Sequence, residues 1–160
     1  MTAKGTMHFD KKENKLTLTR IINAPRELVW QAWTDSKHLQ RWWGPKGFTN
    51  PTCNWDAKAG NKLYVEMKAP DGTVYPMNGE FREIIKPEKL IFTSAALDKN
   101  GKRLFEILNT IVFTKEGNAT KLTMSVVVSN ITPEAALYLA GMEEGWKQSL
   151  DRLEEYVVKI

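Results

Sequence analysis

The feature that most constrains the fold is a change of hydrophobic period near Thr132. From Pro51 to Val128, apolar and polar residues alternate with period two, and turn residues interrupt the alternation at short intervals. Such a pattern is typical of an antiparallel meander. After Thr132, apolar residues recur at positions 139, 142, 146, 150, 153 and 157. This helical spacing predicts a terminal helix of about seven turns, roughly 40 Å long, whose single apolar stripe must lie across the sheet.

The chain before the meander predicts one strand followed by two short helices. Residues 1–14 are polar and aperiodic, which predicts a flexible N-terminal tail, and residues 15–160 are expected to form a single domain. The alternation over 16–22 predicts the first strand. Pro25 suits the first turn of a helix, and Asp35 or Ser36 offers the N-cap of a second one that runs through Trp42. Thr132, followed by Pro133, offers the N-cap of the terminal helix.

Composition excludes several classes of protein. No stretch approaches the roughly 18 apolar residues of a membrane span, and the N-terminus has no apolar signal region, so we expect a water-soluble, cytoplasmic protein. The net charge is +4, but lysines and arginines are spread singly among acids, which argues against a nucleic-acid partner. Cys53 is the only cysteine, and His8 and His38 are the only histidines. The sequence therefore predicts no disulfide, metal site, cofactor or cysteine nucleophile, and no catalytic residue is identified.

Tryptophan is unusually frequent, with six residues in a chain of 160. Four of them form the pairs Trp30 and Trp33, and Trp42 and Trp43. A large aromatic side chain buries on the order of 150 to 250 Å², so such a cluster must either fill much of the core or line a cavity. Methionine and phenylalanine on the strands allow the same two interpretations, because both fill cores and both suit deformable pockets. The pattern of residues leaves the choice open.

Several local sequences resemble the activator of heat-shock protein 90 ATPase homologue-like family, within the START-like (SRPBCC) superfamily. They are, in order, APRELVWQAWTD at 24–35, WWGP at 42–45, PDG at 70–72, GEFREIIKP at 79–87, and GMEEGW at 141–146 with Leu150. The resemblance covers roughly residues 16–158. It implies an α+β helix-grip fold, also called START-like or pollen-allergen-like. In this fold a curved antiparallel sheet of about six or seven strands wraps around a long C-terminal helix, and two short helices follow the first strand.

The resemblance also implies where a ligand would bind. The space between sheet and terminal helix is the expected cavity, and the loop at Gly44 to Phe48 beside the short helices is its expected mouth. Gly141 and Gly145 lie on or beside the apolar stripe at a cost of about 1 kcal/mol each, which is easier to understand if something approaches the helix closely. The candidate cavity-lining residues are Trp33, Trp43, Phe48, Met67, Met77, Phe81, Phe92, Phe105, Met142, Trp146 and Leu150.

Three functions follow as hypotheses. The first is non-covalent binding of a small hydrophobic or aromatic molecule in the cavity, by a monomer or weak homodimer. The second, implied by the resemblance, is a co-chaperone-like module in the stress response that binds a heat-shock ATPase through an exposed apolar patch. The third is a cyclase- or hydrolase-type enzyme, which needs a strand carboxylate pointing into the pocket. The candidates for that carboxylate are Glu66, Glu80, Glu83 and Glu106.

Overall fold

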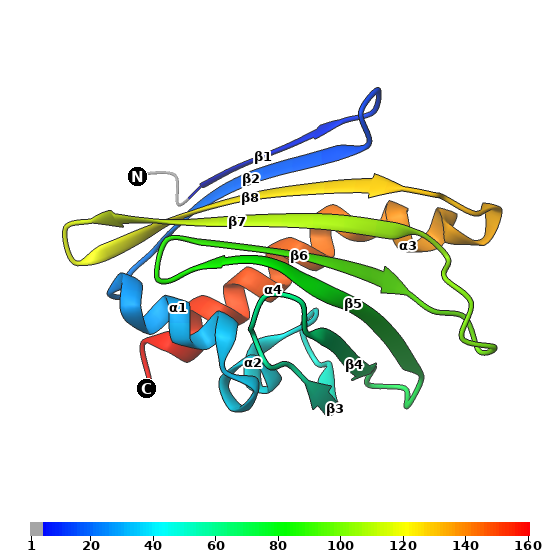
Figure 1. The fold of residues 1–160 in the computed structure, drawn as a ribbon, viewed down its shortest axis with the longest axis horizontal. Helices are drawn as coiled ribbons and strands as arrows, with labels where there is room; N and C mark the ends of the chain where they lie inside the picture. The colour runs from blue at the N-terminus through cyan, green and yellow to red at the C-terminus, as the bar shows by residue number, and fades with distance from the viewer. Residues whose placement is uncertain (1–4) are drawn as a thin grey trace.

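The computed structural model describes residues 5–160. Eight strands form one antiparallel sheet in the order β1-β2-β8-β7-β6-β5-β4-β3 (Figure 1). Their bounds are β1 Gly5–Asp10, β2 Lys15–Ile22, β3 Thr49–Asn54, β4 Lys62–Lys68, β5 Val74–Ile85, β6 Lys89–Ala96, β7 Glu106–Glu116 and β8 Ala119–Ser129. The helices are α1 Arg26–Thr34, α2 Ser36–Trp42, the short 3-10 helix η1 Pro133–Ala135, α3 Ala136–Ala140 and α4 Met142–Val157.

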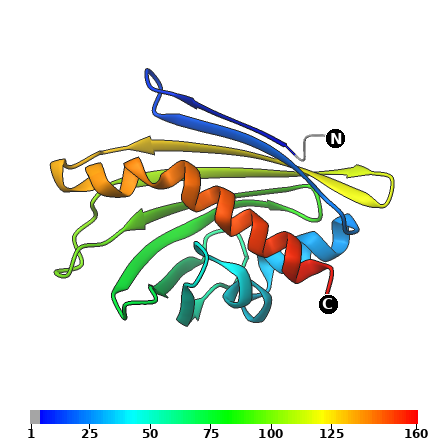
Figure 2. The same ribbon diagram turned by 180° about the vertical axis from the view of Figure 1, so that it is seen from behind.

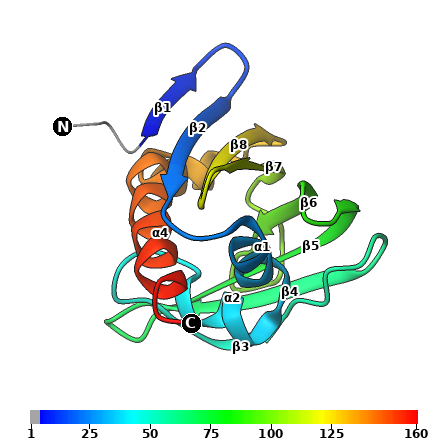
Figure 3. The same ribbon diagram turned by 90° about the vertical axis from the view of Figure 1, so that its left-hand side faces the viewer.

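The sheet curls, and α4 crosses its concave face (Figure 2). Seen from the end, the strands form an arc whose open side is closed by α4, while α1 and α2 plug the end of the arc near the C-terminus (Figure 3). A register shift between Phe81 and Glu83 in the pairing of β5 with β6 marks a bulge or irregularity, and such features bend strands. This arrangement agrees with the helix-grip α+β class expected from the sequence.

The sheet has eight strands, whereas the sequence predicts six or seven. The prediction of a tail to residue 14 is wrong for Gly5–Asp10, which form β1 and pair with β2. Met7 and Phe9 alternate with polar neighbours and pack against the core, but this alternation is too short to stand out beside the charged residues that follow. Residues 1–4 of the predicted tail lie outside the described residues. The other addition, β3, is irregular where it pairs with β4.

The terminal helix is not one continuous rod. Gly141, where φ is −93° and ψ is 0°, forms a turn that interrupts the regular helix and separates α3 from α4. Glycine has the largest backbone entropy to lose in a helix, which makes it a natural point of interruption. The 16 residues of α4 span about 24 Å, less than the predicted 40 Å. Thr132 occupies the N-cap position of η1, but its hydroxyl donates to the carbonyl of Leu104 at 2.7 Å instead of capping.

The core divides into two clusters. The larger one joins α1, α2 and the C-terminal half of α4 to the sheet, and Trp33, Trp42 and Leu153 within it are fully buried. The smaller one, around Phe105 and Ala135, lies at the end where α3 begins. Met142 packs against both clusters, so the space between them is the place where a cavity can form.

Candidate ligand-binding cavity

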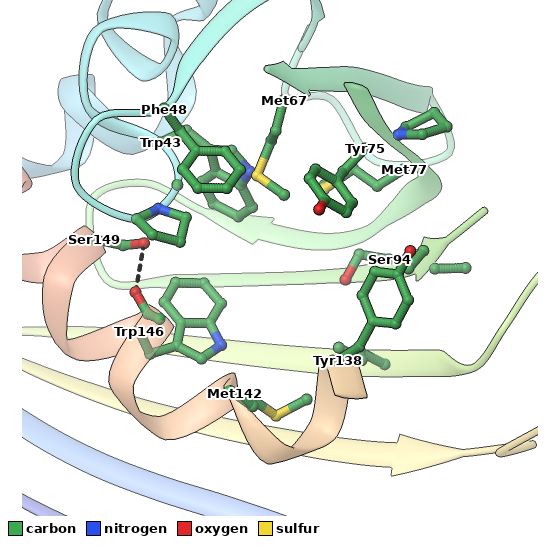
Figure 4. A pocket seen from close by; sticks show the side chains of 18 of the residues that line it. Trp43, Phe48, Met67, Tyr75, Met77, Ser94, Tyr138, Met142, Trp146 and Ser149 are labelled. Atoms are coloured by element: carbon green, nitrogen blue, oxygen red, sulfur yellow. Dashed lines mark hydrogen bonds between the residues drawn. The ribbon is translucent and has the colours of Figure 1, made fainter. Parts of the chain in front are cut away.

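A cavity of about 270 Å³ lies between the sheet and the junction of α3 with α4 (Figure 4). Its wall is built from the loop after α2, the strands β4 to β7, and the two helices. The nineteen lining residues are Trp43, Gly44, Pro45, Phe48, Met67, Tyr75, Pro76, Met77, Ser94, Ala95, Ala96, Phe105, Ile107, Tyr138, Gly141, Met142, Gly145, Trp146 and Ser149. No side chain among them carries a full charge, so the cavity suits an uncharged, apolar molecule.

Aromatic rings form much of the wall. The rings of Trp43 and Trp146 meet edge to face with their centroids 5.5 Å apart, and they join the loop after α2 to α4. On the opposite side, Tyr75 contacts Phe48 and Tyr138, with centroid distances of 6.0 Å in both pairs. Figure 4 shows Trp43, Phe48 and Trp146 on one side of the cavity, and Tyr75 and Tyr138 on the other. Flat aromatic faces of this kind favour a flat ligand.

The helical side of the cavity includes three small residues beside Tyr138, Met142 and Trp146. Gly145 and Ser149 are one turn apart on the same face of α4, Gly141 lies at the junction of α3 with α4, and all three line the cavity. The Ser149 hydroxyl donates to the carbonyl of Gly145 at 2.9 Å, so its hydrogen is already engaged within the helix (Figure 4). The cavity therefore exists partly because the helix presents no large side chain at these positions.

The loop from Trp43 to Phe48 is tied to α4 by one arginine. Nη1 of Arg152 donates to the carbonyls of Trp43, Gly44 and Pro45 at 3.1, 2.9 and 3.0 Å. Gly44 has φ of +96°, which a side chain would disfavour, and an added Cβ would lie 3.2 Å from the sulfur of Met67. Burial lowers the pKa of Arg152. The guanidinium thus holds the backbone carbonyls of the loop that follows α2, and its Nη2 donates to the carbonyl of Arg41 in the last turn of α2 at 3.2 Å. These contacts fix one wall of the cavity.

A polar pair, Ser94 on β6 and Asn109 on β7, lies in the sheet beside the cavity. Ser94 follows Leu90 and Phe92 in the alternation of β6, faces inward, and is 9 % exposed. Nδ2 of the buried Asn109 on β7 donates to Ser94 Oγ at 3.0 Å and to the Phe92 carbonyl at 3.3 Å. Nearby, burial and, to a smaller extent, Tyr75 and Asp98 raise the pKa of Tyr138. Its hydroxyl is therefore protonated at neutral pH.

The carboxylates considered for catalysis do not line this cavity. Each has a polar or charged partner instead: Glu66 accepts from Tyr64 Oη at 2.7 Å, Glu80 pairs with Arg82 at 3.0 Å, Glu83 with Lys89 at 3.6 Å, and Glu106 with Arg103 at 2.8 Å. Glu80 and Glu106 border a different, polar depression of the surface. The feature on which the enzyme hypothesis depends, a carboxylate in the apolar pocket, is thus missing from the lining residues.

Cysteine and histidine also lie away from the cavity. Burial raises the pKa of the Cys53 thiol to about 11, so the thiolate is scarce at neutral pH. His38 Nδ1 lies 2.6 Å from Tyr156 Oη, and this pair joins α2 to α4. Across residues 5–160, no three His, Cys, Asp or Glu side chains are grouped so that they could hold a metal ion.

Seven of the eleven residues predicted from the sequence to line a cavity do so here. They are Trp43, Phe48, Met67, Met77, Phe105, Met142 and Trp146. The other four, Trp33, Phe81, Phe92 and Leu150, are at most 1 % exposed and lie in the larger core cluster, outside the cavity wall. Whether the seven contact a ligand stays a prediction.

Sequence reasoning missed most of the small and polar part of the wall. Ser94, Ala95 and Ala96 at the end of β6 give no signal, because a small side chain in an alternating strand pattern does not show whether it borders a packed core or a cavity. Tyr75 and Tyr138 were available as amphipathic aromatics but were not singled out. Gly141 and Gly145 did carry a signal, since glycine inside a helical pattern is costly and suggests close approach or open space.

Comparison with known proteins identifies the family. The model of the family described as "Activator of Hsp90 ATPase homolog 1-like protein" matches residues 23–158. The chain belongs to this family. Membership of the Hsp90 ATPase activator homolog family agrees with the motifs between residues 24 and 150, and the match begins just before α1. None of the curated proteins compared with the chain matches it.

Solved structures of several bacterial proteins share the fold of this family member. A protein from Nitrosomonas europaea is 29% identical, with a TM-score of 0.78 and coverage of 94% of this chain and 97% of that one. One from Arthrobacter aurescens is 25% identical, with a TM-score of 0.84 over 97% and 92% of the two chains. Protein Ms6760 from Mycobacterium smegmatis is 22% identical, with a TM-score of 0.79 over 94% of each chain, and supports the fold alone.

Proposed function

We propose that this protein binds a small, uncharged aromatic molecule non-covalently in the cavity between the sheet and α4. The observation that carries the proposal is a cavity of about 270 Å³ whose nineteen lining residues include no charged side chain. Ligand pockets usually measure about 300–1,000 Å³, so a molecule of one or two rings is the size expected. Apolar cavities of even about 150 Å³ stay dry and take up benzene, which shows that such a space can drive binding.

The test uses methyl naphthyl ketone as a probe, because its two fused rings match the flat aromatic walls. We expect saturable binding at a ratio of one to one by isothermal titration calorimetry. The indole N–H signals of Trp43 and Trp146 should shift in proton–nitrogen correlation spectra, since both rings face the cavity. Absence of heat and of any shift in these two signals would contradict the proposal.

Gly145→Leu provides the matching variant. An added Cβ at Gly145 meets only Pro45 Cγ, at 3.8 Å, which is ordinary contact, so the longer leucine side chain has to extend into the cavity. Leucine also favours a helix more than glycine by about 1 kcal/mol, so the fold should survive. We expect at least tenfold weaker probe binding with an unchanged or higher melting temperature. Gly145→Ala is the control, because it brings much of the helical gain while filling little of the cavity.

Protein interaction of the ATPase-activator type is a second candidate, favoured by the name of the family model alone. The exposed large apolar side chains of the described residues lie at the two ends of β5, on β7, in the loop after β8 and after the end of α4: Val74, Ile85, Leu108, Ile131, Val158 and Ile160. A protein-binding surface is more often one contiguous apolar patch. Retention of a heat-shock ATPase on the immobilised protein, together with a change in its ATP turnover, is the result that would favour this candidate over the first.

Localisation in the cytoplasm remains a proposal from the sequence. Among the described residues, no helix has both the length and the apolar composition needed to cross a membrane.

A further inference from the structure

The end of the cavity lined by β6 holds one hydroxyl whose hydrogen-bonding role is fixed by its neighbour. Asn109 is 1 % exposed, and its amide contacts both the carbonyl of Phe92 and the hydroxyl of Ser94. A backbone carbonyl can only accept, so the atom of Asn109 near it must be the NH₂ group. This contact assigns Nδ2 of Asn109 to the side of the Phe92 carbonyl, and it leaves Asn109 Oδ1 buried without a hydrogen-bond partner among the described residues.

The same NH₂ group then determines what Ser94 can do. Since Asn109 Nδ2 donates to Ser94 Oγ at 3.0 Å, the oxygen of Ser94 serves as an acceptor toward the protein, and its own hydrogen must point elsewhere. Ser94 makes no second hydrogen bond with a protein group in the part of the chain that the structure describes. Figure 4 shows Ser94 at the cavity wall on the side of Tyr75 and Tyr138.

We infer that the Ser94 hydroxyl is a hydrogen-bond donor to the ligand, and that the cavity therefore selects a flat aromatic molecule carrying a carbonyl-type acceptor at one end. This inference rests on the binding function proposed above and narrows its ligand class. A buried hydroxyl with a free hydrogen costs free energy unless a partner accepts from it. A ligand that supplies the acceptor at this point is preferred over one of equal shape that does not, since the site's polar group is otherwise unpaired.

The contrast with Ser149 explains why Ser94 is singled out. Both hydroxyls line the cavity and both residues are more than nine-tenths buried. The hydrogen of Ser149 is engaged by the carbonyl of Gly145, one turn earlier in α4, so Ser149 has no donor to offer a ligand. Tyr75, Tyr138 and Trp146 also have donor groups at the wall, but no partner among residues 5–160 fixes the direction of any of them as Asn109 does for Ser94.

The experiment compares two probes of the same shape. Methyl naphthyl ketone carries a carbonyl acceptor, and isopropenylnaphthalene carries a CH₂ group in place of the oxygen. After correction for the transfer of each probe from water to hydrocarbon, we expect the folded protein to prefer the ketone by about five- to tenfold, as one neutral hydrogen bond provides. Ser94→Ala should abolish this preference. Ser149→Ala, the matched control, should keep the preference at its wild-type size.

A measurement on the unmodified protein makes the test independent of whether the variant folds. The carbonyl stretch of the bound ketone should lie below its frequency in hydrocarbon solvent, because a donor lengthens the C=O bond. A band at the hydrocarbon frequency, equal binding of the two probes, or a preference that persists in Ser94→Ala would overturn the role of Ser94 while the proposed binding function stands. If neither probe binds, both the proposed binding function and the inference about Ser94 are contradicted.

Discussion

The two halves of α4 face the same sheet but leave very different interiors. Leu150, Leu153 and Val157 in the second half are at most 1 % exposed and close the space completely. In the first half, Gly145 stands on the helix face, with Ser149 one turn later, and both border a cavity of about 270 Å³. Aromatic residues are abundant on both sides, so they do not decide between core and cavity. The difference lies in Gly145 and Ser149, whose small side chains leave open space on the helix face, whereas Leu150, Leu153 and Val157 fill the space beneath the second half.

The largest loss of stability should come from removing a large side chain from the packed core. Trp33 is fully buried and contacts Trp42 edge to face, with centroids 4.8 Å apart. Trp33→Ala should lower the free energy of unfolding by about 3–5 kcal/mol, the usual loss for a large aromatic in a core. Urea denaturation followed by circular dichroism measures it. Phe48→Ala, in the cavity wall, is the comparison and should lose about 1 kcal/mol. Equal losses would remove the distinction between the two halves.

A sharper comparison uses two positions on the same face of α4, eight residues apart. Leu150 lies in the larger core cluster, while Met142 borders the cavity and is only partly buried. Leu150→Ala should cost about 3 kcal/mol, because the packed neighbours cannot fill the space left behind. Met142→Ala should cost about 1 kcal/mol, because it enlarges a cavity that is already present. Urea denaturation measures the loss in free energy of unfolding for both variants. A greater loss for Met142→Ala than for Leu150→Ala would show that the cavity is filled in solution.

The sequence predicts the elements of this fold better than the space between them. Alternation identifies β2 and the strands from β4 to β8, and the spacing after Thr132 identifies the terminal helical segment, because each pattern is local. Whether an aromatic residue faces the cavity depends on contacts between distant segments, and no local sequence pattern shows it. Phe92 and Phe105 are both buried phenylalanines, yet Phe92 is core and Phe105 lines the cavity. The curvature of the sheet and the placement of α4 decide this.

The role of Arg152 also depends on contacts between distant segments, since its carbonyl partners lie more than 100 residues away. Arg152→Met keeps most of the aliphatic stem and removes the donors. We expect a loss of about 1–2 kcal/mol, below that of a fully buried ion because Arg152 is partly exposed. The loop carrying Trp43 should also loosen, so probe dissociation should become faster. Stopped-flow displacement measures the rate. Lys147→Met, an exposed change on α4, is the control and should alter neither quantity.

The smallest effect has the opposite sign. Gly145→Ala removes the conformational freedom that glycine has in the unfolded chain, and its added Cβ meets no atom closer than 3.8 Å. The variant should be more stable by about 0.5–1 kcal/mol in urea denaturation. Gly60→Ala is a useful contrast, because Gly60 has φ of +90° and open space around it, so the same substitution should destabilise through the backbone alone. A gain at Gly145 would mean that the wild-type chain forgoes stability at this position, which is expected if the open space beside the helix serves a ligand. A loss there would instead mean that the glycine is required by local geometry, and the contrast between the two halves of α4 would then reflect packing rather than binding.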